Sequence, residues 1–516
     1  MVVGRLRCVA VAGIAVSLAA CTTTVYRAKF SPPDKPQEID FDAPFLKCHM
    51  KDGTVYVLAA QWRVDAEAKR IDARGIHYDT NREVVDHGEY HLSIDDVALF
   101  ETNRPEKFLD NGVTVLAVMT IASVGLSVAC LANPKACFGS CPTFYAFDGE
   151  HESLQAEGFS ASIARALEAT DVDAMWTARA PGTSFDVRMT NDAFETHSVD
   201  SVRLLVAPRP PGGRVLRAGD VFYDATALTA PAACTSEEGD CLEAVKATDG
   251  REYKSPADEH DLATRETIDL RFDAPARGRR GLLLVARNSL MNTFLFYQAL
   301  AYMGRSAGEW MSALERAGPA GAKAFQGLGA LGGIHVEVET APGQWREAGV
   351  WDEVGPIALE AQVVPLPELP AGPVHARLTA TRGYWRIEQA SLVSLGETVV
   401  PTALEPVAVL RDGHPRPDAR AKLRPGGEHL VTGPRDEWLL RFELPAADPE
   451  LFLESRGYYY EWMRPSWLEE EDLGELARFA FDSRGELRRL APKYKRLEPD
   501  MDRVFWQSRL GAERLR

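Results

Sequence analysis

The alternation of apolar and polar positions predicts a mainly β protein. Such alternation over four to eight residues is typical of half-buried strands, and Pro- and Gly-rich turns separate the runs. Asp52-Gly53, at the head of the first runs, predicts a tight turn between antiparallel strands. The strand-like runs are Val55 to Val64, Arg70 to Tyr78, His91 to Phe100, several between Ser184 and Asn288, and several more between Ile334 and Leu392.

Four segments depart from this pattern and predict helices. Asn111 to Pro134 carries no charged residue and is long enough to span a bilayer. Its Ala, Gly and Ser content also suits close packing, so a buried or membrane-dipping helix is favoured over a true span. Helical stretches are predicted over Ser162 to Ala169 and Phe294 to Ala317, and Ser466 with Glu469 can form a capping box for a helix through Ala480.

Together these patterns predict an α+β chain that is mainly β. It should hold several small β-sheet or β-sandwich domains, one long apolar helix and a helical C-terminal segment. The expected divisions are a signal peptide at 1–20, a lipidated tether at 21–44, a small β domain at 45–105, the apolar helix at 106–136, a β-sandwich-like domain at 137–293, a helical linker at 294–333, a jelly-roll-like β domain at 334–396, and a β domain with the helical segment at 397–516.

The N-terminus has the features of a signal peptide. Arg5 and Arg7 precede an apolar run from Cys8 to Leu18 that is too short to cross a membrane. The run ends in Leu18-Ala19-Ala20-Cys21, which resembles the lipobox of bacterial lipoproteins. The resemblance implies that Cys21 carries a lipid and, because Thr22 is not acidic, that the protein is anchored in the outer membrane, facing the periplasm.

Composition agrees with an exported globular protein. Of the 516 residues 45% are hydrophobic, which is ample for packed cores, and the formal net charge is -17. A strongly acidic chain without a basic stripe opposes nucleic-acid binding.

Once Cys8 is removed and Cys21 is lipidated, six cysteines remain, and an even set in an oxidising compartment favours disulfides. Cys234 and Cys241 enclose a short acidic loop in which Gly239 permits a turn. A disulfide is expected there, since zinc would need two further ligands nearby. Cys137 and Cys141 are a second candidate pair, for a structural bridge rather than a redox site because their spacing is not Cys-x-x-Cys.

Ser140 to Glu150 reads SCPTFYAFDGE and follows the apolar segment. It resembles a group of predicted bacterial lipoproteins with an S-C-P-x-x-Y-x-x-D-G-E motif after an apolar helix, and the likeness continues to Arg456 to Tyr459. The resemblance implies architecture and location, but no chemistry.

A weak internal repeat is also present. Glu266 to Pro275, followed by GLLLVARN, is echoed by Asp436 to Pro445, followed by LFLESRG. Two copies are too few for a solenoid, so a duplicated β-sandwich edge is expected.

Aromatic residues are the candidate ligand-binding side chains. Trp345, Trp351, Tyr384 and Trp385 lie in a region that resembles jelly-roll modules of the galactose-binding type. The resemblance implies an exposed aromatic face able to stack on a ligand, with core packing as the alternative. A second aromatic run, Tyr458 to Tyr460, must place rings on both faces of its strand.

No recognisable catalytic motif is present: there is no His-Glu-x-x-His, Gly-x-Ser-x-Gly or Gly-rich phosphate loop. The charged cluster Asp258 to Asp261 is expected to be a solvated loop. The sequence therefore favours a binding or scaffold component of the cell envelope, without a cofactor or metal, whose partner is an envelope protein or glycan. The alternative is an envelope hydrolase acting on glycan or peptide.

Overall fold

About half of the residues that the computed structural model describes lie in strands, far more than lie in helices, which confirms the mainly β class. The described chain divides into two bodies. The first is Met1–Val124 with Ala301–Trp310 and Met463–Ala477, and the second is Gly125–Leu300, Met311–Trp462 and Arg478–Arg516. The described residues are 22–59, 62–79, 84–109, 141–160, 162, 164–193, 195–273, 278–308, 331–352, 355–370, 372–461 and 470–508.

The first body contains a seven-stranded antiparallel sheet in the order β1-β7-β2-β3-β5-β4, with β6 on the other edge of β5. The expected turn at Asp52-Gly53 joins β2 to β3, with the Gly53 N–H donating to the Met50 carbonyl at 3.0 Å. Residues of alternating burial, such as Leu46, Cys48 and Met50, form its core. The strands are β1 (Thr22–Ser31), β2 (Leu46–Met50), β3 (Val55–Leu58), β4 (Arg63–Asp65), β5 (Arg70–Tyr78), β6 (Val84–Ser93) and β7 (Val97–Leu109).

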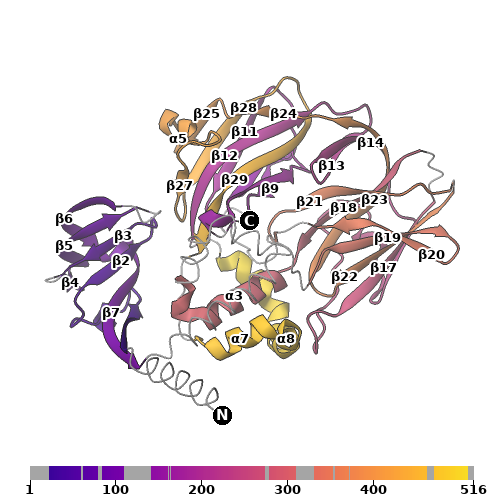
Figure 1. The fold of residues 1–516 in the computed structure, drawn as a ribbon. Helices are drawn as coiled ribbons and strands as arrows, with labels where there is room; N and C mark the ends of the chain where they lie inside the picture. The colour runs from indigo at the N-terminus through magenta and orange to yellow at the C-terminus, as the bar shows by residue number, and fades with distance from the viewer. Residues whose placement is uncertain are drawn as a thin grey trace, which may run out of the picture. The chain divides into compact units, whose positions relative to one another are not determined.

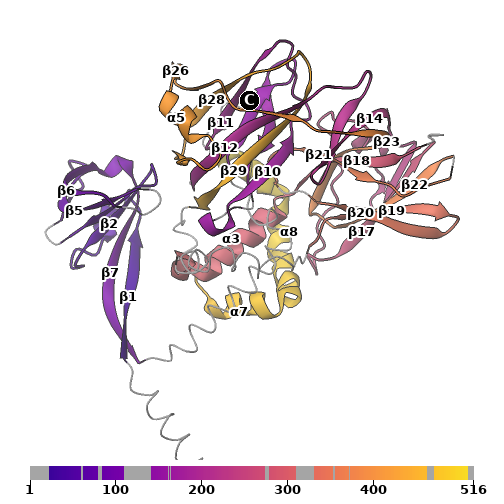
Figure 2. The same cartoon turned by 45° about the horizontal axis from the view of Figure 1, so that its top comes forward.

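Three expectations for this body were wrong. The run from Val55 to Val64 is not one strand, because it contains β3 and the start of β4. The run from His91 to Phe100 is not one strand, because the 3-10 turn η2 (Ile94–Asp96) divides it and the Ser93 hydroxyl accepts the Asp95 N–H at 3.2 Å. Residues Thr22–Ser31 are not a free tether but strand β1, which pairs with β7 along its whole length. Figure 2 shows β1 and β7 as a long two-stranded ribbon. The tether prediction failed because it relied on polar composition and on prolines that all lie beyond β1.

The second body contains a β-sandwich-like pair of sheets, in which β11 pairs with β28 in one sheet and β12 pairs with β29 in the other (Figure 1). One sheet contains β10 (Ala169–Ala174), β12 (Glu195–Ala207), β24 (Thr402–Leu404), β27 (Leu430–Thr432) and β29 (Glu450–Glu461). The other contains β8 (Thr143–Phe147), β9 (Glu152–Glu157), β11 (Ser184–Thr190), β25 (Ala408–Arg411), β26 (His414–Pro415) and β28 (Glu437–Glu443).

The described strands between β12 and β24 form an inserted module of two further sheets. A closed ring contains β13 (Arg214–Ala218), β14 (Val221–Thr229), β18 (Arg280–Asn288), β21 (Glu360–Pro365) and β23 (Trp385–Val399). A six-stranded sheet contains β15 (Ala233–Ser236), β16 (Gly239–Asp240), β17 (Arg265–Phe272), β19 (Ile334–Ala341), β20 (Gln344–Trp351) and β22 (Val374–Thr381). The core of the ring, including Leu283 and Val363, continues onto Leu205 and Phe452 of the sandwich.

This nesting corrects the expected linear series of domains. Residues 334–396 are not a separate jelly roll, because their strands are shared between the ring and the six-stranded sheet, which both need strands from 214–288. Likewise, strands from 402–461 complete the sheets that β8–β12 begin. Alternation identifies strands, but it carries no information on which strands pair across long separations.

Each copy of the sequence repeat forms two consecutive strands, the first in one sheet and the second in another. In the inserted module β17–β18 pairs with β22–β23, and in the sandwich β28–β29 pairs with β11–β12. The repeat therefore marks one strand pair in each module rather than a duplicated edge.

Helices are few among the described residues. They are α3 (Met291–Met303), α5 (Pro417–Lys422), α7 (Leu473–Phe481) and α8 (Ser483–Ser508), with short 3-10 turns that include η1 (Pro36–Glu38), η4 (Arg165–Leu167), η5 (Leu242–Ala244) and η6 (Gly304–Ser306). Asp472 caps α7 by accepting the Gly474 N–H at 2.9 Å. The predicted capping box at Ser466 and the apolar segment from Asn111 lie outside the described residues. Among the described residues, no helix is long and apolar enough to cross a membrane.

Candidate functional site

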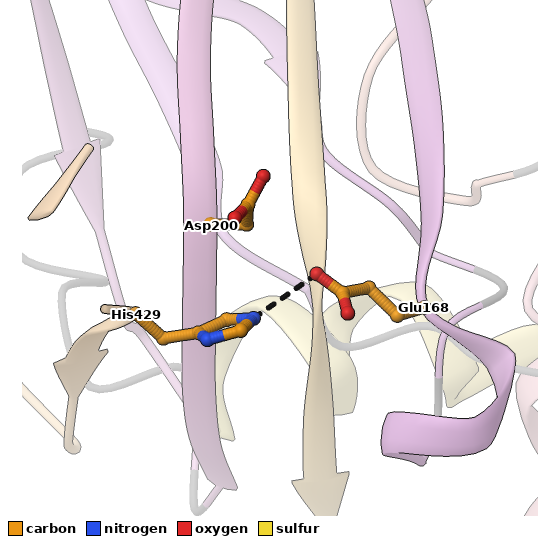
Figure 3. Close-up of side chains that lie close together, drawn as sticks. All are labelled: Glu168, Asp200 and His429. Carbon is orange, nitrogen blue, oxygen red and sulfur yellow. Dashed lines mark hydrogen bonds and ion pairs between the residues drawn. The ribbon is translucent and has the colours of Figure 1, made fainter. Parts of the chain in front are cut away.

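The candidate site is a cluster of Glu168, Asp200 and His429 in the sandwich. Within the described part of the chain, these are the three metal-ligating side chains, one His and two carboxylates, whose ligand atoms all lie within 4.8 Å of one another. Figure 3 shows the His429 ring pointing toward the Glu168 carboxylate, with Asp200 on β12 beside them.

Local backbone features bring these three side chains together. Glu168 caps the 3-10 turn η4 just before β10, where the sequence had predicted a helix instead. Asp200 is the extra residue of a bulge in β12, since Val199 pairs with Gly457 and Ser201 pairs with Arg456. Bulges re-aim side chains and often occur beside functional sites. His429 directly precedes the short strand β27.

Each member of the cluster has a protein partner. His429 Nε2 lies 3.0 Å from Glu168 Oε1, and Asp200 Oδ1 accepts the Gly426 N–H at 2.9 Å. Arg456 lies between the two carboxylates, with its Nε 3.6 Å from Glu168 Oε1 and 3.7 Å from Asp200 Oδ2. The guanidinium therefore supplies the positive charge that a metal ion would bring.

The electrostatics keep Glu168 ionised. The hydrogen bond from His429 lowers the pKa of this carboxyl below its ordinary value, and the charge of Arg456 lowers it further against the opposing effect of burial. A carboxyl with a lowered pKa is a poor general acid at neutral pH. The donor set of two carboxylates and one imidazole suits Zn²⁺, but a metal would have to displace both Arg456 and the His429 hydrogen bond.

No motif could have identified this cluster, because its members are isolated residues far apart in the sequence. Glu168 and His429 are 261 positions apart. A bulge cannot be read from alternation over Val199 to Val202, so Asp200 resembled any polar residue of a buried strand.

The aromatic face expected from the galactose-binding resemblance is not formed. Trp351, Tyr384 and Trp385 are only 1%, 1% and 3% exposed, and their rings pack edge to face in the core. The Tyr384 hydroxyl also donates to Asn292 at 3.1 Å. Rings without exposed faces cannot stack on a ligand, so the prediction was wrong for these three.

Trp345 alone of the four lies on the polar face of the six-stranded sheet, half-buried. The Arg377 guanidinium lies 3.9 Å from its ring centroid, and the His375 ring meets it at 4.7 Å. Its ring is thus already covered by neighbouring side chains. In the second aromatic run Tyr458 and Tyr459 are also buried, which agrees with core packing.

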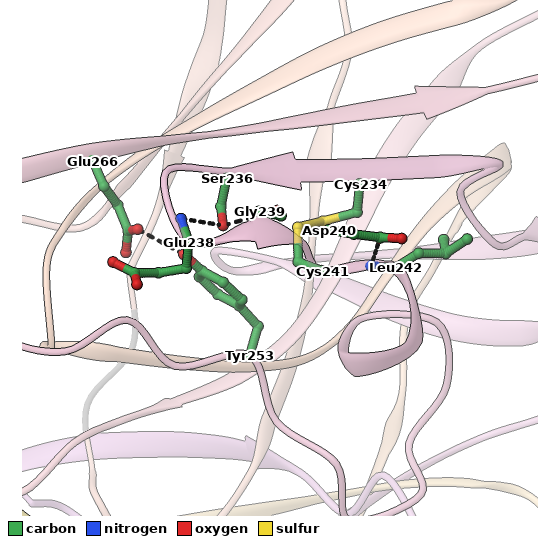
Figure 4. The surroundings of a disulfide bond; sticks show 9 residues. All are labelled: Cys234, Ser236, Glu238, Gly239, Asp240, Cys241, Leu242, Tyr253 and Glu266. Carbon is green, nitrogen blue, oxygen red and sulfur yellow. Dashed lines mark hydrogen bonds between the residues drawn. A yellow bond between two sulfur atoms is a disulfide. The ribbon is translucent and has the colours of Figure 1, made fainter.

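The predicted disulfide between Cys234 and Cys241 is confirmed. Figure 4 shows it closing the hairpin of β15 and β16, where Ser236 accepts the Glu238 N–H at 3.1 Å. Arg382 pairs with both Glu237 and Glu238 of the hairpin, so the acidic loop is held against the turn that follows β22.

The other cysteine predictions are not settled. Cys137 lies outside the described residues, so its pairing with Cys141 stays a prediction, and the buried Cys141 Sγ lies 3.3 Å from Ser160 Oγ. Cys21 also lies outside the described residues. Burial raises the pKa of the Cys48 thiol, which disfavours its reactive thiolate form.

The charged cluster Asp258 to Asp261 is an ordered loop. Asp258 accepts the N–H groups of His260 and Asp261, both at 2.8 Å. Asp261 also pairs with Arg484 and Arg488 of α8. The cluster therefore helps to hold the C-terminal helix.

Comparison with known proteins assigns no family. No family model matches the chain, and no curated protein matches it. A solved structure of the GH31 α-xylosidase from Xanthomonas citri is similar with a TM-score of 0.15 at 10% identity, over 85% of this chain and 38% of that one. The chain thus spans well under half the length of that enzyme, and so low a score supports no conclusion about fold or activity.

Proposed function

We propose that this protein is an outer-membrane lipoprotein, anchored through Cys21 and facing the periplasm, that acts as a binding or scaffold component of the cell envelope. The observation that carries the proposal is the disulfide between Cys234 and Cys241, because disulfides persist in oxidising compartments. It supports the reading of Leu18 to Cys21 as a lipobox.

The charge balance of the Glu168 cluster favours binding over catalysis. Its carboxylates are compensated by Arg456, and its imidazole is engaged by Glu168. Such a cluster stabilises the junction of η4, β12 and β27.

Mass spectrometry of the protein from bacterial envelopes tests the anchor. Trypsin should release the N-terminal peptide Cys21 to Arg27 with a diacylglycerol and an N-acyl mass, from protein that sediments with the outer membrane. Alkylation before reduction should leave Cys234 and Cys241 unmodified. An unmodified N-terminus, or alkylated thiols at both positions, would contradict the proposal. Cross-linking in intact envelopes, followed by purification, should then recover a specific protein or glycan.

The envelope hydrolase remains the second candidate because the same cluster holds a carboxylate–imidazole pair. If it is catalytic, Glu168→Gln and His429→Asn should abolish hydrolysis of peptidoglycan fragments while thermal stability changes little. On our proposal the wild type has no such activity, and both variants lose stability instead.

A further inference from the structure

One face of the seven-stranded sheet carries a cluster of aromatic side chains. The register places Tyr56 of β3 opposite His77 of β5, and His77 opposite Asp86 of β6. Residues that lie opposite one another in neighbouring strands point to the same face of a sheet. The His77 ring stacks on Tyr56 with the centroids 4.3 Å apart, and the Tyr90 ring meets Tyr56 edge-on at 4.8 Å.

Two further rings extend this cluster along the same core. Phe41 stacks on Trp62 with the centroids 5.6 Å apart, and Trp62 packs against the sheet core, as Tyr90 does. Phe41 is 55% exposed, and the other rings are half-buried, unlike the buried aromatic residues of the inserted module. An exposed apolar patch of this kind often marks a binding surface. The aromatic patch consists of Phe41, Tyr56, Trp62, His77 and Tyr90.

A hydrogen-bonding carboxylate lies within the aromatic patch. The Asp86 side chain is 60% exposed, and its Oδ1 accepts the Tyr90 hydroxyl at 2.6 Å and lies 3.6 Å from His77 Nδ1. Burial and the hydrogen bond to Asp86 raise the pKa of Tyr90 to about 12, so this hydroxyl stays protonated and keeps donating. Asp86 is thus held in place beside the rings as an acceptor that solvent, or a ligand, can reach.

The charge on this face restricts the ligand. Alternate residues of a strand point to opposite faces, so the register places the basic residues of β2 to β6 on the other face from Tyr56. These basic residues are Lys47, Arg63, Arg70 and Arg74. Among the described residues of β2 to β6, the patch therefore combines rings and a carboxylate without a lysine or arginine, an arrangement that repels acidic ligands.

We propose that the aromatic patch binds a neutral glycan. A sugar ring has C–H groups on its faces and hydroxyls around its rim, so it can stack on the rings of the patch while a hydroxyl donates to Asp86. Aromatic walls with a few fixed polar groups are typical of ligand sites. The inference rests on the proposed binding role, and it gives that role a surface and a class of ligand.

Isothermal titration calorimetry on the full chain tests the proposal. The probes are three neutral oligosaccharides, chitohexaose, cellohexaose and maltohexaose, and one acidic oligosaccharide, hexagalacturonate. We expect at least one neutral probe to bind and the acidic probe not to bind. If none of the neutral probes binds at millimolar concentration, or if the acidic probe binds best, the proposal is overturned.

Variants locate the binding on this patch. Asp86→Asn keeps the shape of the carboxylate, and Phe41→Ala removes an exposed ring, so neither should unfold the sheet. Each should weaken binding of the neutral probe about tenfold. Trp345→Ala is the matched control, because Trp345 is half-buried in the second body, and it should bind as the wild type does. Hydrogen exchange of the β5 and β6 amides should be unchanged in all three variants. Wild-type affinity in both Asp86→Asn and Phe41→Ala would contradict the proposal.

This proposal and the proposed function fail separately. If the peptide Cys21 to Arg27 carries no acyl group while the neutral probe binds through Asp86, the lipid anchor is wrong and the glycan site stands. If the protein is acylated and cross-links in envelopes to a specific protein while no neutral probe binds, the glycan site alone is overturned.

Discussion

Neutralising Glu101 should remove a pH-dependent part of the stability of the N-terminal sheet. Glu101 lies on β7 directly opposite Lys47 on β2, and its side chain is only 11% exposed. Lys47 Nζ donates to it at 2.6 Å, and His49 Nε2 lies 2.8 Å from its other oxygen. Burial raises the pKa of this carboxyl, but its hydrogen bonds and charge interactions with His49 and Lys47 outweigh burial and lower the pKa from 4.5 to about 2.

The size of the effect follows from proton linkage. A pKa that falls from 4.5 to about 2 on folding stabilises the sheet by about 3 kcal/mol at pH 7, at 1.36 kcal/mol per pKa unit. This stabilisation is fully present above pH 4.5 and is lost as the pH falls toward 2. At pH 3 about 1.4 kcal/mol remains, because the folded carboxylate is then still mostly ionised.

The variant Glu101→Gln keeps the shape of the side chain and removes its charge. Hydrogen exchange of the β2 and β7 amides, corrected for intrinsic rates, reports the local opening free energy. The difference in local opening free energy between the wild type and Glu101→Gln should be about 2 kcal/mol smaller at pH 3 than at pH 7. Asp95→Asn is the control, because Asp95 pairs with Lys69 on the surface of the same sheet. A difference that stays the same at both pH values would refute the reasoning.

Three other predictions concern the second body. Replacing Cys234 and Cys241 by Ser should lower the unfolding free energy of this body, measured in guanidinium, by about 2.5 kcal/mol, because the bond closes only a short loop in the unfolded chain. Reduction of the wild-type protein should lower the unfolding free energy by the same amount. Gly383→Ala should lower the melting temperature clearly more than Gly343→Ala: both glycines have positive φ, but only at Gly383 would a Cβ lie 2.7 Å from the Ala257 backbone. Asp261→Asn should speed hydrogen exchange in the first turns of α8 by less than tenfold, since its partners Arg484 and Arg488 are largely exposed.

Local patterns predicted the local elements of this fold well. Alternation located β5 at its observed bounds, Asp52-Gly53 marked a turn, and the short acidic loop between Cys234 and Cys241 marked a disulfide. Each of these depends on contacts between residues close in sequence. Such contacts leave a signature within a window of about ten residues.

The failures involve contacts across long separations. Tyr384 and Trp385 looked like surface aromatics after a turn, but both are buried. Their partners, Asn292 of α3 for Tyr384 and Trp351 of β20 for Trp385, lie far from them in the sequence. The Glu168 cluster depends on a bulge at Asp200 and on His429, which only the folded sandwich brings near. Polar composition also led to the wrong prediction of a tether at Thr22–Ser31, because a polar strand and a polar linker have the same pattern in a single sequence.

The nested arrangement explains how so many long-range pairings can be satisfied at once. The ends of the inserted module lie opposite one another, since Val206 of β12 pairs with Thr402 of β24. Once the ring and the six-stranded sheet have formed from 214–399, those ends are already close. Formation of the module already brings the ends of this long segment together. The loop-closure entropy that remains for the pairing of β12 with β29 is therefore small. The repeated strand pairs β17–β18 and β28–β29 fit this order, because each is completed within its own module, by β22–β23 and by β11–β12.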